Sequence, residues 1–401
     1  MAEMNESANS NNPTFCSATF CSAKCYDSFD DMGLSDELAR GVYSYGFEVP
    51  SKIQQLAIVP MKEHNDILAQ AQSGTGKTGA FTIGSLSVVD PTIKAPQVLV
   101  ICPTRELAQQ SERVAQQIGH YMGVRVLSAT GGNQIRNDIQ SLKSGAQFII
   151  GTPGRIFDLI RRGDLVLDYM RYLILDEADQ MLEDLFCEQI KAILNNKFPN
   201  TTRLALFSAT MPASMLEVAE NYLNDPMRIL LPKDEVTLDG IKQYYVYLER
   251  EDWKLAVLLD LYQHVTVNQA LIYVNKRQKA EWLVKQLVSH GFTIEYIHGE
   301  MEVHERKKRM DDFRSGSTRV LISTDLLARG IDVQQVSLVI NYELPIQREN
   351  YVHRIGRSGR YGKKGTAINL VCGNEMNTMK EIEEHYSTMI LELPEDVSSW
   401  I

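Results

Sequence analysis

A chain of 401 residues is too long for one ordinary hydrophobic core, so its length predicts two or three domains. Its net charge of −10 argues against a general polyanion binder but does not exclude a basic cleft on an acidic body. No apolar run approaches the roughly 20 residues that a membrane span needs, so the sequence predicts no membrane association.

The first 27 residues are rich in Asn and Ser and predict a disordered N-terminal tail. This tail has no charged-then-apolar pattern of a secretory signal, which favours a cytoplasmic location with a nuclear one as the alternative. Its three cysteines, Cys16, Cys21 and Cys25, lack the Cys-x-x-Cys spacing of a metal knuckle. The other three cysteines show no framework spacing, which predicts reduced thiols.

Ordered structure is expected to begin near Phe29. Ser35 precedes Asp36 and Glu37, a pattern that favours a helix start because acids stabilise the positive end of the helix dipole. Gly46 favours the end of that helix, since glycine adopts the left-handed conformation of a helix cap.

Strand-like apolar runs then alternate with amphipathic stretches, which is the βαβ rhythm of a parallel sheet. The predicted strands are 67–71, 98–102, 125–129, 148–151, 173–175, 204–208, 243–248, 270–274, 293–297, 320–323, 338–341 and 366–371. The predicted helices are 106–121, 135–143, 155–161, 185–197, 253–263, 278–290, 304–313 and 350–355. A charged segment with Pro232 and Gly240 predicts a linker at 232–242. The fold class is therefore α/β, with domains at 28–231 and 243–401, each a mainly parallel sheet flanked by helices.

A glycine-rich loop follows the first predicted strand and precedes a helix. Glycines let backbone N–H groups surround phosphate oxygens at the positive end of the next helix. Lys77 is expected to reach the β- and γ-phosphates of ATP, and the Thr78 hydroxyl to ligate Mg²⁺. The strict pattern starts with glycine where this chain has alanine, and an ordinary glycine-rich turn is the alternative. The predicted ATP-binding loop comprises Ala71, Gln72, Ser73, Gly74, Thr75, Gly76, Lys77 and Thr78.

Three acids follow a short apolar run at the end of another predicted strand: Asp176, Glu177 and Asp179. Open α/β sheets bind ligands at this end of their strands, whereas a solvated acidic turn is the alternative. The Lys-Thr pair of the loop favours the ligand site, because such a site needs an acid that holds Mg²⁺ through its water shell. Asp176 is expected to take this role, and Glu177 to orient and polarise the attacking water.

Positive charge gathers in the second half of the chain, in a run that reads His-Arg-Ile-Gly-Arg-Ser-Gly-Arg from His353 to Arg360. Its arginines recur every three residues, at Arg354, Arg357 and Arg360. Arginine forks bind phosphate oxygens bidentately, and the two glycines let the backbone approach a ligand. We expect Arg357 and Arg360 to reach a nucleotide on the first domain, so that hydrolysis needs both domains. A generic basic turn is the alternative.

With these motifs in this order, the chain resembles the DEAD-box RNA helicases, and most closely the eukaryotic translation initiation factor 4A group. The resemblance runs from about Ser28 to Ile401 and implies two RecA-like domains joined by a short linker. It implies an RNA-stimulated ATPase that locally unwinds short RNA duplexes, with ATP and Mg²⁺ as cofactors. It also implies a monomer that works with a scaffold protein and a small RNA-binding cofactor in translation initiation.

The resemblance assigns roles to residues around the nucleotide. Gln54, in a match to the Q motif that starts at Gly46, would hydrogen-bond the adenine edge, and Phe29 would stack on the ring. Asp332 would lie near the ribose. The catalytic residues would be Lys77, Glu177, Arg357 and Arg360. The residues that would couple hydrolysis to domain closure are Asp179, Ser208, Thr210 and His353.

The same resemblance places RNA contacts in loops at strand ends. Taken alone, these loops carry hydroxyls, backbone amides and single arginines, groups that bind phosphate and sugar without reading sequence. Aromatic residues are not interleaved with them, which favours recognition of the backbone and the 2′-hydroxyl, and hence RNA over DNA. The predicted contacts are Pro103, Thr104, Arg105, Gly132, Thr152, Pro153, Arg155 and Thr324.

One departure from the family pattern is Val303, which stands where a Gln-x-x-Arg motif has its glutamine, whereas Arg306 is retained. The loss of that amide bears on RNA binding or domain closure, not on ATP binding. An ATP-gated RNA clamp of the exon-junction type shares all these motifs and is the first alternative to a helicase. A non-enzymatic scaffold and a DNA translocase are the others, and the intact Lys77 and Glu177 argue against the scaffold.

Overall fold

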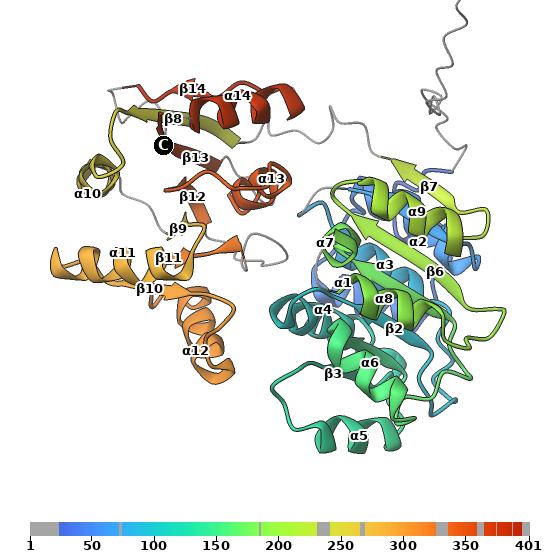
Figure 1. Cartoon of the computed structure of the whole chain (residues 1–401). Coiled ribbons are helices and arrows are strands. Elements are labelled where there is room, and N and C mark those ends of the chain that lie inside the picture. The colour runs from blue at the N-terminus through green and yellow to red at the C-terminus, as the bar shows by residue number, and fades with distance from the viewer. Residues whose placement is uncertain are drawn as a thin grey trace, which may run out of the picture.

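The structure, a computed structural model, describes residues 24–71, 74–183, 186–230, 241–264, 269–325, 336–358, 365–373, 375–386 and 388–394. Figure 1 shows two lobes, blue to green for the first half of the chain and yellow to red for the second. Each lobe is a sheet with helices packed on its faces. Most of the predicted linker and the tail up to residue 23 lie outside the described residues.

The first helix shows how local signals set the bounds of an element. α1 (Asp36–Tyr45) begins after Ser35, whose hydroxyl accepts a hydrogen bond from the Leu38 amide at 3.3 Å. A cap of this kind stabilises a helix by about 1 kcal/mol. The helix ends at Gly46, whose φ of 101° is one that glycine adopts without strain. Both predicted ends are therefore confirmed.

The first domain is built on a seven-stranded sheet. Its strands are β1 (Ile67–Gln70), β2 (Val98–Ile101), β3 (Val126–Ala129), β4 (Phe148–Gly151), β5 (Tyr172–Asp176), β6 (Arg203–Ser208) and β7 (Met227–Leu230). Its other helices are η1 (Asp30–Met32), α2 (Lys52–Lys62), α3 (Lys77–Leu86), α4 (Arg105–Ile118), η2 (His120–Met122), α5 (Ile135–Lys143), α6 (Pro153–Arg161), α7 (Ala178–Glu183), α8 (Cys187–Leu194) and α9 (Ala213–Tyr222). The strands lie in the order β3-β4-β2-β5-β6-β1-β7, and neighbours are parallel.

The second domain repeats this plan. Its strands are β8 (Ile241–Leu248), β9 (Gln269–Tyr273), β10 (Ile294–Ile297), β11 (Val320–Ser323), β12 (Val336–Asn341), β13 (Gly365–Cys372) and β14 (Leu391–Glu392). Its helices are α10 (Trp253–His264), α11 (Arg277–Ser289), α12 (Val303–Arg314), α13 (Glu349–Ile355) and α14 (Glu375–Tyr386). The order β10-β11-β9-β12-β13-β8-β14 matches the first sheet strand for strand, and neighbours are again parallel.

Both faces of each sheet are covered by apolar side chains. In β2, Val98 and Val100 join the cluster on one face, and Leu99 and Ile101 join the cluster on the other. Successive side chains of a strand point to opposite faces, so a strand covered by helices on both sides reads as an unbroken apolar run. This burial explains why the central strands were predictable, and the α/β fold class is confirmed.

The differences from prediction lie at the edges. β7 and β14 were not predicted, because these short edge strands bury at most one side chain and carry no apolar run. β8 begins at Ile241, so the last two residues of the predicted linker belong to a strand. Tyr26, in the predicted tail, packs against the core of the first domain. Among the described helices, none is long and apolar enough to cross a membrane.

Candidate functional site

The glycine-rich loop lies at the carboxyl end of β1 and leads into α3. Gly74 and Gly76 have φ values of 89° and 98°, left-handed values that favour glycine. A Cβ atom at Gly76 would lie 2.7 Å from the Ser51 hydroxyl, so the loop is packed tightly against α2. Lys77, the first residue of α3, is 5% exposed. The loop and helix therefore hold its ammonium group in a buried position.

Two acids meet this lysine from the carboxyl end of β5. The Lys77 Nζ lies 3.4 Å from Glu177 Oε1, and both side chains are almost fully buried. Glu177 has a φ of 52°, a left-handed conformation that costs a non-glycine residue about 1–2 kcal/mol. Its amide donates a hydrogen bond to Asp176 Oδ1 at 3.0 Å. This strained turn keeps two carboxylates and one ammonium together in a buried site.

The electrostatics of this cluster favour a further cation. Burial first, and the Glu177 carboxylate second, raise the pKa of Asp176 from 3.8 to about 7, whereas the Lys77 ammonium lowers it. Carboxylate oxygens are ligands that Mg²⁺ prefers, and a cation would offset the repulsion between the two acids. No cluster of three or more Asp, Glu, His or Cys side chains is arranged for a metal among the described residues. Asp176 would therefore hold Mg²⁺ only if phosphates and water supplied the other ligands.

Asp176→Asn is expected to remove a pH dependence from the stability of the nucleotide-free protein. An acid whose pKa is raised by folding contributes stability below its unfolded value of 3.8 and loses that contribution as the pH rises through about 7. The variant should therefore melt at a higher temperature than wild type at pH 8, and this difference should be much smaller at pH 5. Thermal unfolding in EDTA measures both. Asp168→Asn, at an exposed position, is the control, and an equal difference at the two pH values would contradict the assignment.

The predicted adenine-binding residues pack against the glycine-rich loop. Gln54 accepts a hydrogen bond from the Ser51 amide at 2.8 Å and donates one to the Gly76 carbonyl at 3.3 Å. It thus caps α2 and fixes the loop backbone at the same time. Phe29 is 1% exposed, and its ring stacks on Phe47 with centroids 6.3 Å apart. The roles of Gln54 and Phe29 toward adenine stay predictions.

The Ser208–Thr210 turn contacts both the glycine-rich loop and Asp179. The Ala71 amide donates to the Ser208 carbonyl at 2.9 Å, and the Thr210 hydroxyl donates to Asp179 Oδ2 at 2.7 Å. From the second domain, His353 Nε2 lies 3.7 Å from the same Asp179 oxygen, and neither side chain is more than 1% exposed. The four residues predicted to couple hydrolysis to closure therefore lie in one chain of contacts.

The predicted arginine fingers follow this contact in the sequence. Arg357 is 2% exposed, and its Nε donates to the His353 carbonyl at 3.0 Å. It therefore lies in the turn after α13, next to the place where the two domains meet. The predicted site residues Gln72, Ser73, Asp332 and Arg360 lie outside the described residues.

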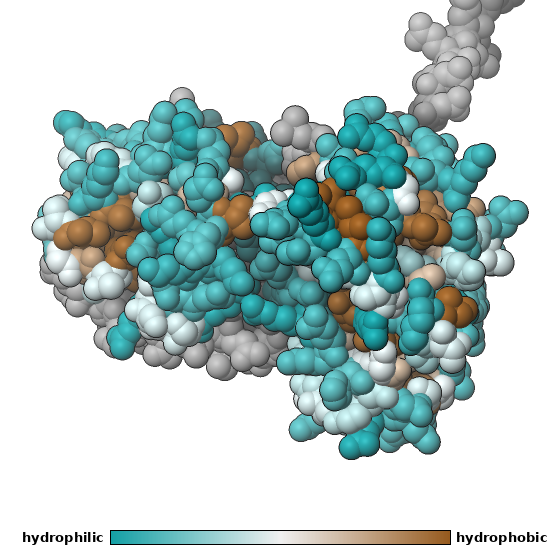
Figure 2. Space-filling model, turned by 90° about the horizontal axis from the view of Figure 1, so that it is seen from below, coloured by the Kyte–Doolittle hydropathy of each residue, from teal (hydrophilic) through white to brown (hydrophobic). Residues whose placement is uncertain are grey.

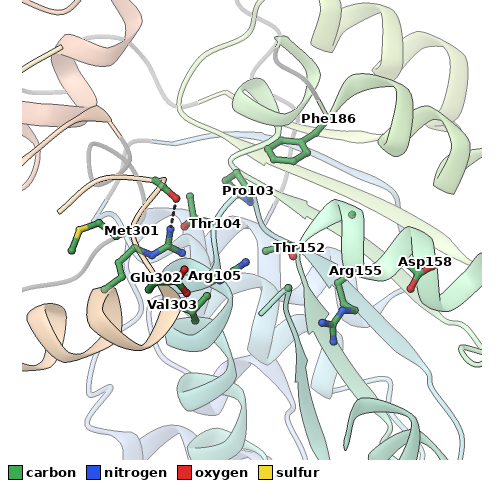
Figure 3. Close-up of a pocket in the computed structure, with 14 residues that line it drawn as sticks. Pro103, Thr104, Arg105, Thr152, Arg155, Asp158, Phe186, Met301, Glu302 and Val303 are labelled. Carbon is green, nitrogen blue, oxygen red and sulfur yellow. Dashed lines mark hydrogen bonds between the residues drawn. The ribbon is translucent and has the colours of Figure 1, made fainter. Parts of the chain in front are cut away.

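A second site lies where α4 and α6 of the first domain meet the start of α12, around a cavity of about 540 Å³. Figure 3 shows Met301, Glu302 and Val303 of the second domain approaching Thr104 and Arg105 of the first. The cavity is lined by Pro103, Thr104, Arg105, Gly131, Thr152, Gly154, Arg155, Asp158, Phe186, Gly299, Met301, Glu302, Val303 and Arg306. Five of the eight predicted RNA contacts are in this lining.

The cavity favours an anion. Thr104 and Thr152 occupy the N-cap positions of α4 and α6, where backbone amides and the helix dipole attract negative charge. Burial and the nearby Arg306 guanidinium lower the pKa of Arg105, which shows that positive groups from both domains converge here. Glu106 lies 2.7 Å from Arg306 and offsets part of this charge. Asp158 and Glu302 also line the cavity, so a phosphate group there would depend on Arg105 and the two helix N-termini.

The other three predicted RNA contacts are not among the residues that line the cavity. Gly132 lies against the second domain, because a Cβ atom there would be 2.6 Å from Val303 Cγ2. Pro153 is the buried first residue of α6. Thr324 follows β11 in the second domain and is not in the lining. Their roles toward RNA stay predictions.

Arg155 uses its guanidinium within the first domain. It forms a buried ion pair with Asp138 and donates to the Asn133 carbonyl at 2.7 Å. Burial raises the pKa of Asp138 in spite of this pair. These contacts hold the loop after β3 beside the cavity, so a phosphate contact by Arg155 would use its remaining donors and stays a prediction.

Comparisons with family models and related proteins indicate the same two domains. A model described as DEAD/DEAH box helicase matches residues 51–218, and one described as helicase conserved C-terminal domain matches residues 253–362. Over 375 residues, the chain is 54% identical to the ATP-dependent RNA helicase eIF4A of Chaetomium globosum, with 94% of each chain covered. The chain belongs to the DEAD/DEAH box helicase family. The predicted family and the two RecA-like domains are therefore confirmed.

Solved structures of DEAD-box proteins indicate how the two domains are placed. S. cerevisiae Dbp5 bound to RNA and ADP BeF3 is 36% identical and aligns with a TM-score of 0.86, covering 93% of this chain and 97% of Dbp5. A Dbp5 variant bound to nup159, gle1, ip6 and ADP is 34% identical and aligns with a TM-score of 0.64, covering 92% and 97%. Because coverage is nearly equal, we attribute the difference to the placement of the domains. This DEAD-box chain is therefore more similar overall to Dbp5 bound to RNA and ADP BeF3 than to the variant bound to nup159, gle1, ip6 and ADP.

Sequence reasoning missed two contacts of this DEAD-box cleft. The Arg306–Glu106 pair crosses between domains, and its partners are 200 residues apart, so no spacing in the sequence indicates it. Removing one partner of such a buried pair typically costs about 3–5 kcal/mol. Val303 was identified as a missing glutamine that could simply pack, and the structure shows it packed against Gly132, a partner that the sequence did not indicate. An unexpected apolar residue at the start of a charged helix was the available signal.

Gly132→Ala is expected to lower RNA-stimulated ATPase activity by about tenfold or more, the effect of losing about 1.4 kcal/mol of closure energy. The added methyl group would lie 2.6 Å from both Val303 and Arg105 and so keep the domains apart. Gly163→Ala is a matched control, because Gly163 has a similar φ of 73° but open space around it. The control shares the backbone strain and should keep its RNA stimulation. Equal losses in both variants would refute a steric role for this contact.

Proposed function

We propose that this chain is an ATP-dependent RNA helicase that couples ATP hydrolysis to local unwinding of short RNA duplexes in translation initiation. The observation that carries the proposal is the division of the phosphate chemistry between two domains that meet at Asp179 and His353. Lys77 and Glu177 come from the first domain and Arg357 from the second. Neither domain alone contains the groups that phosphoryl transfer requires.

In the proposed hydrolysis step, Lys77 neutralises the β- and γ-phosphates in the buried loop, where its charge is weakly screened. Glu177 accepts a proton from the water that attacks the γ-phosphorus. The bond between the γ-phosphorus and the bridging oxygen breaks, and ADP leaves with its electron pair. Arg357 and Arg360 stabilise the charge on the transferred phosphoryl oxygens. Thr78 and Asp176 would hold Mg²⁺, which supplies further positive charge to the phosphates.

Binding of RNA would be coupled to this step by domain closure. The α4 and α6 N-termini and Arg105 would bind the RNA backbone on the first domain, and Thr324 would bind it on the second. The cleft is complete only when both domains are together, so RNA and ATP each favour the closed state. Phosphate release would then let the cleft reopen. The contacts available are to phosphate and sugar, so single strands and short duplexes bind without sequence preference.

The cellular context is part of the proposal. Similarity to eIF4A over nearly the whole chain favours a cytoplasmic monomer that is directed by a scaffold protein and a small RNA-binding cofactor. We propose domain limits at 28–231 and 243–401 with a linker at 232–242, of which Ile241 and Lys242 already belong to β8. Capture from cell extract with ATP and RNA tests the context: a cap-binding scaffold among the captured proteins supports initiation. Exon-junction proteins there would favour the RNA clamp instead.

The activity is tested by steady-state ATPase assays with and without RNA, and by unwinding of a short labelled duplex. We expect RNA to raise turnover and ATP to be required for strand separation. Single-stranded DNA should not replace RNA, since DNA lacks the 2′-hydroxyl. ATP turnover that does not change when RNA is added would contradict the proposed coupling between RNA binding and ATP hydrolysis.

A further inference from the structure

Arg354 belongs to the arginine run of the sequence, yet its environment is not that of a ligand-binding arginine. Its side chain is 0% exposed and is among the largest fully buried side chains of the described residues. A buried charge is costly unless it is paired and hydrogen-bonded. The guanidinium must therefore find its partners inside the protein, and these partners, not its burial, distinguish it from Arg357, which is 2% exposed.

The partners of Arg354 come from three strand ends. Its Nε lies 2.5 Å from Asp325 Oδ1, its Nη1 donates to the Glu343 carbonyl at 2.7 Å, and its Nη2 donates to Asn275 Oδ1 at 2.8 Å. Its guanidinium carbon lies 5.2 Å from the centroid of the Tyr273 ring. These residues stand at or just past the ends of β9, β11 and β12, which are neighbours in the sheet. One side chain thus joins α13 to the carboxyl edge of the sheet.

On one side of Arg354 is the turn predicted to bind RNA. Asp325 directly follows Thr324, and the Ser323 hydroxyl donates to the Thr324 carbonyl at 2.7 Å. The second oxygen of Asp325 accepts a hydrogen bond from Asn350 of α13 at 3.2 Å. The turn is therefore attached to α13 through both carboxylate oxygens.

On the other side of Arg354 are the residues that meet the first domain. His353, its neighbour in α13, lies 3.7 Å from Asp179 across the interface. The His353 carbonyl accepts a hydrogen bond from Arg357. A displacement of α13 relative to the sheet edge would therefore move both His353 and Arg357.

We propose that Arg354 is a positioning residue that couples RNA binding to ATP hydrolysis through its ion pair with Asp325. The inference rests on the proposed function, because it takes Thr324 as an RNA contact and Arg357 as an arginine finger. A planar fork held by acceptors on three strand ends has one favourable geometry, so the turn and α13 shift together. RNA that orders the turn thereby orders the arginine finger.

The test compares Asp325→Asn, Asp325→Glu and Arg354→Lys in ATPase assays with and without RNA. Asp325 has a side chain 34% exposed, so its substitution is compatible with folding. We expect Asp325→Asn and Arg354→Lys each to lower the RNA-stimulated kcat by about tenfold. The ratio of kcat with RNA to kcat without it should fall, and the KM for ATP should stay within about twofold of wild type. Asp325→Glu, which keeps the charge, should recover part of the stimulation.

The double variant Asp325→Asn with Arg354→Lys should be no worse than the more affected single variant, because both changes break one interaction. Arg250→Gln is the matched control: Arg250 pairs with Asp252 in the same domain, but both side chains are more than half exposed. A purely structural Arg354 would lower the melting temperature and reduce ATPase with and without RNA by one factor, which would overturn the inference. Full RNA stimulation in Asp325→Asn would also overturn it. Wild type without RNA stimulation would instead refute the proposed function itself.

Discussion

Glu177→Gln is expected to bind ATP with nearly normal affinity and to hydrolyse it about 10²- to 10⁴-fold more slowly, the usual range for losing a general base. The amide keeps the volume of the side chain but cannot accept a proton from water. The substitution also removes the negative charge that raises the pKa of Asp176. Asp176 should then be more fully ionised, which favours Mg²⁺ and ATP binding.

Single-turnover hydrolysis and equilibrium binding of a fluorescent ATP analogue measure the two effects of Glu177→Gln separately. Glu188→Gln is the matched control, because this substitution removes the same charge at an exposed residue in the first turn of α8. Hydrolysis within threefold of wild type would refute the base role of Glu177. Loss of ATP binding would show that the Lys77–Glu177 pair mainly organises the loop.

Arg357→Lys is expected to lower ATP hydrolysis by about 10³-fold or more, because an arginine finger stabilises transition-state charge through a planar fork that lysine lacks. ATP binding should change little, since the first domain holds the phosphates. The Nε contact of Arg357 to the His353 carbonyl would be lost, but the contact between His353 and Asp179 would remain. The loss should therefore appear in kcat.

Steady-state ATPase at saturating RNA measures the effect of Arg357→Lys, and thermal unfolding checks the fold. Arg314→Lys is the control, because Arg314 makes a partly exposed pair at 3.7 Å with Asp311, within one helix. A kcat near that of wild type would exclude Arg357 as a finger. A raised KM with normal kcat would assign it to nucleotide binding instead.

The nucleotide site was predictable because its signals are local. Lys77 and Asp176 each follow a buried apolar strand, and parallel strands bring their carboxyl ends to one edge. Gly74 and Gly76 have positive φ values, which glycine adopts without strain. Motif order and strand burial were therefore sufficient to place these groups together.

The interface between the domains was much less predictable. The Arg306–Glu106 pair and the packing of Val303 on Gly132 depend on how two separate sheets are placed, and local periodicity carries no information about that placement. Arg354 has the same spacing in the sequence as Arg357, but its buried guanidinium is paired with residues of the second domain. Both arginines are buried, and their hydrogen-bond partners distinguish them, which a three-residue repeat does not reveal.

The matching strand order of the two sheets has a consequence for stoichiometry. The glycine-rich loop with its lysine follows β1, whereas the equivalent strand β8 is followed by Glu249, Arg250, Glu251 and Asp252. An acidic turn of this kind repels phosphate, so we expect no nucleotide to bind at this position of the second domain. At the position equivalent to the glycine-rich loop, the two domains are therefore unequal. Titration with a nucleotide analogue should therefore saturate at one equivalent per chain, without cooperativity.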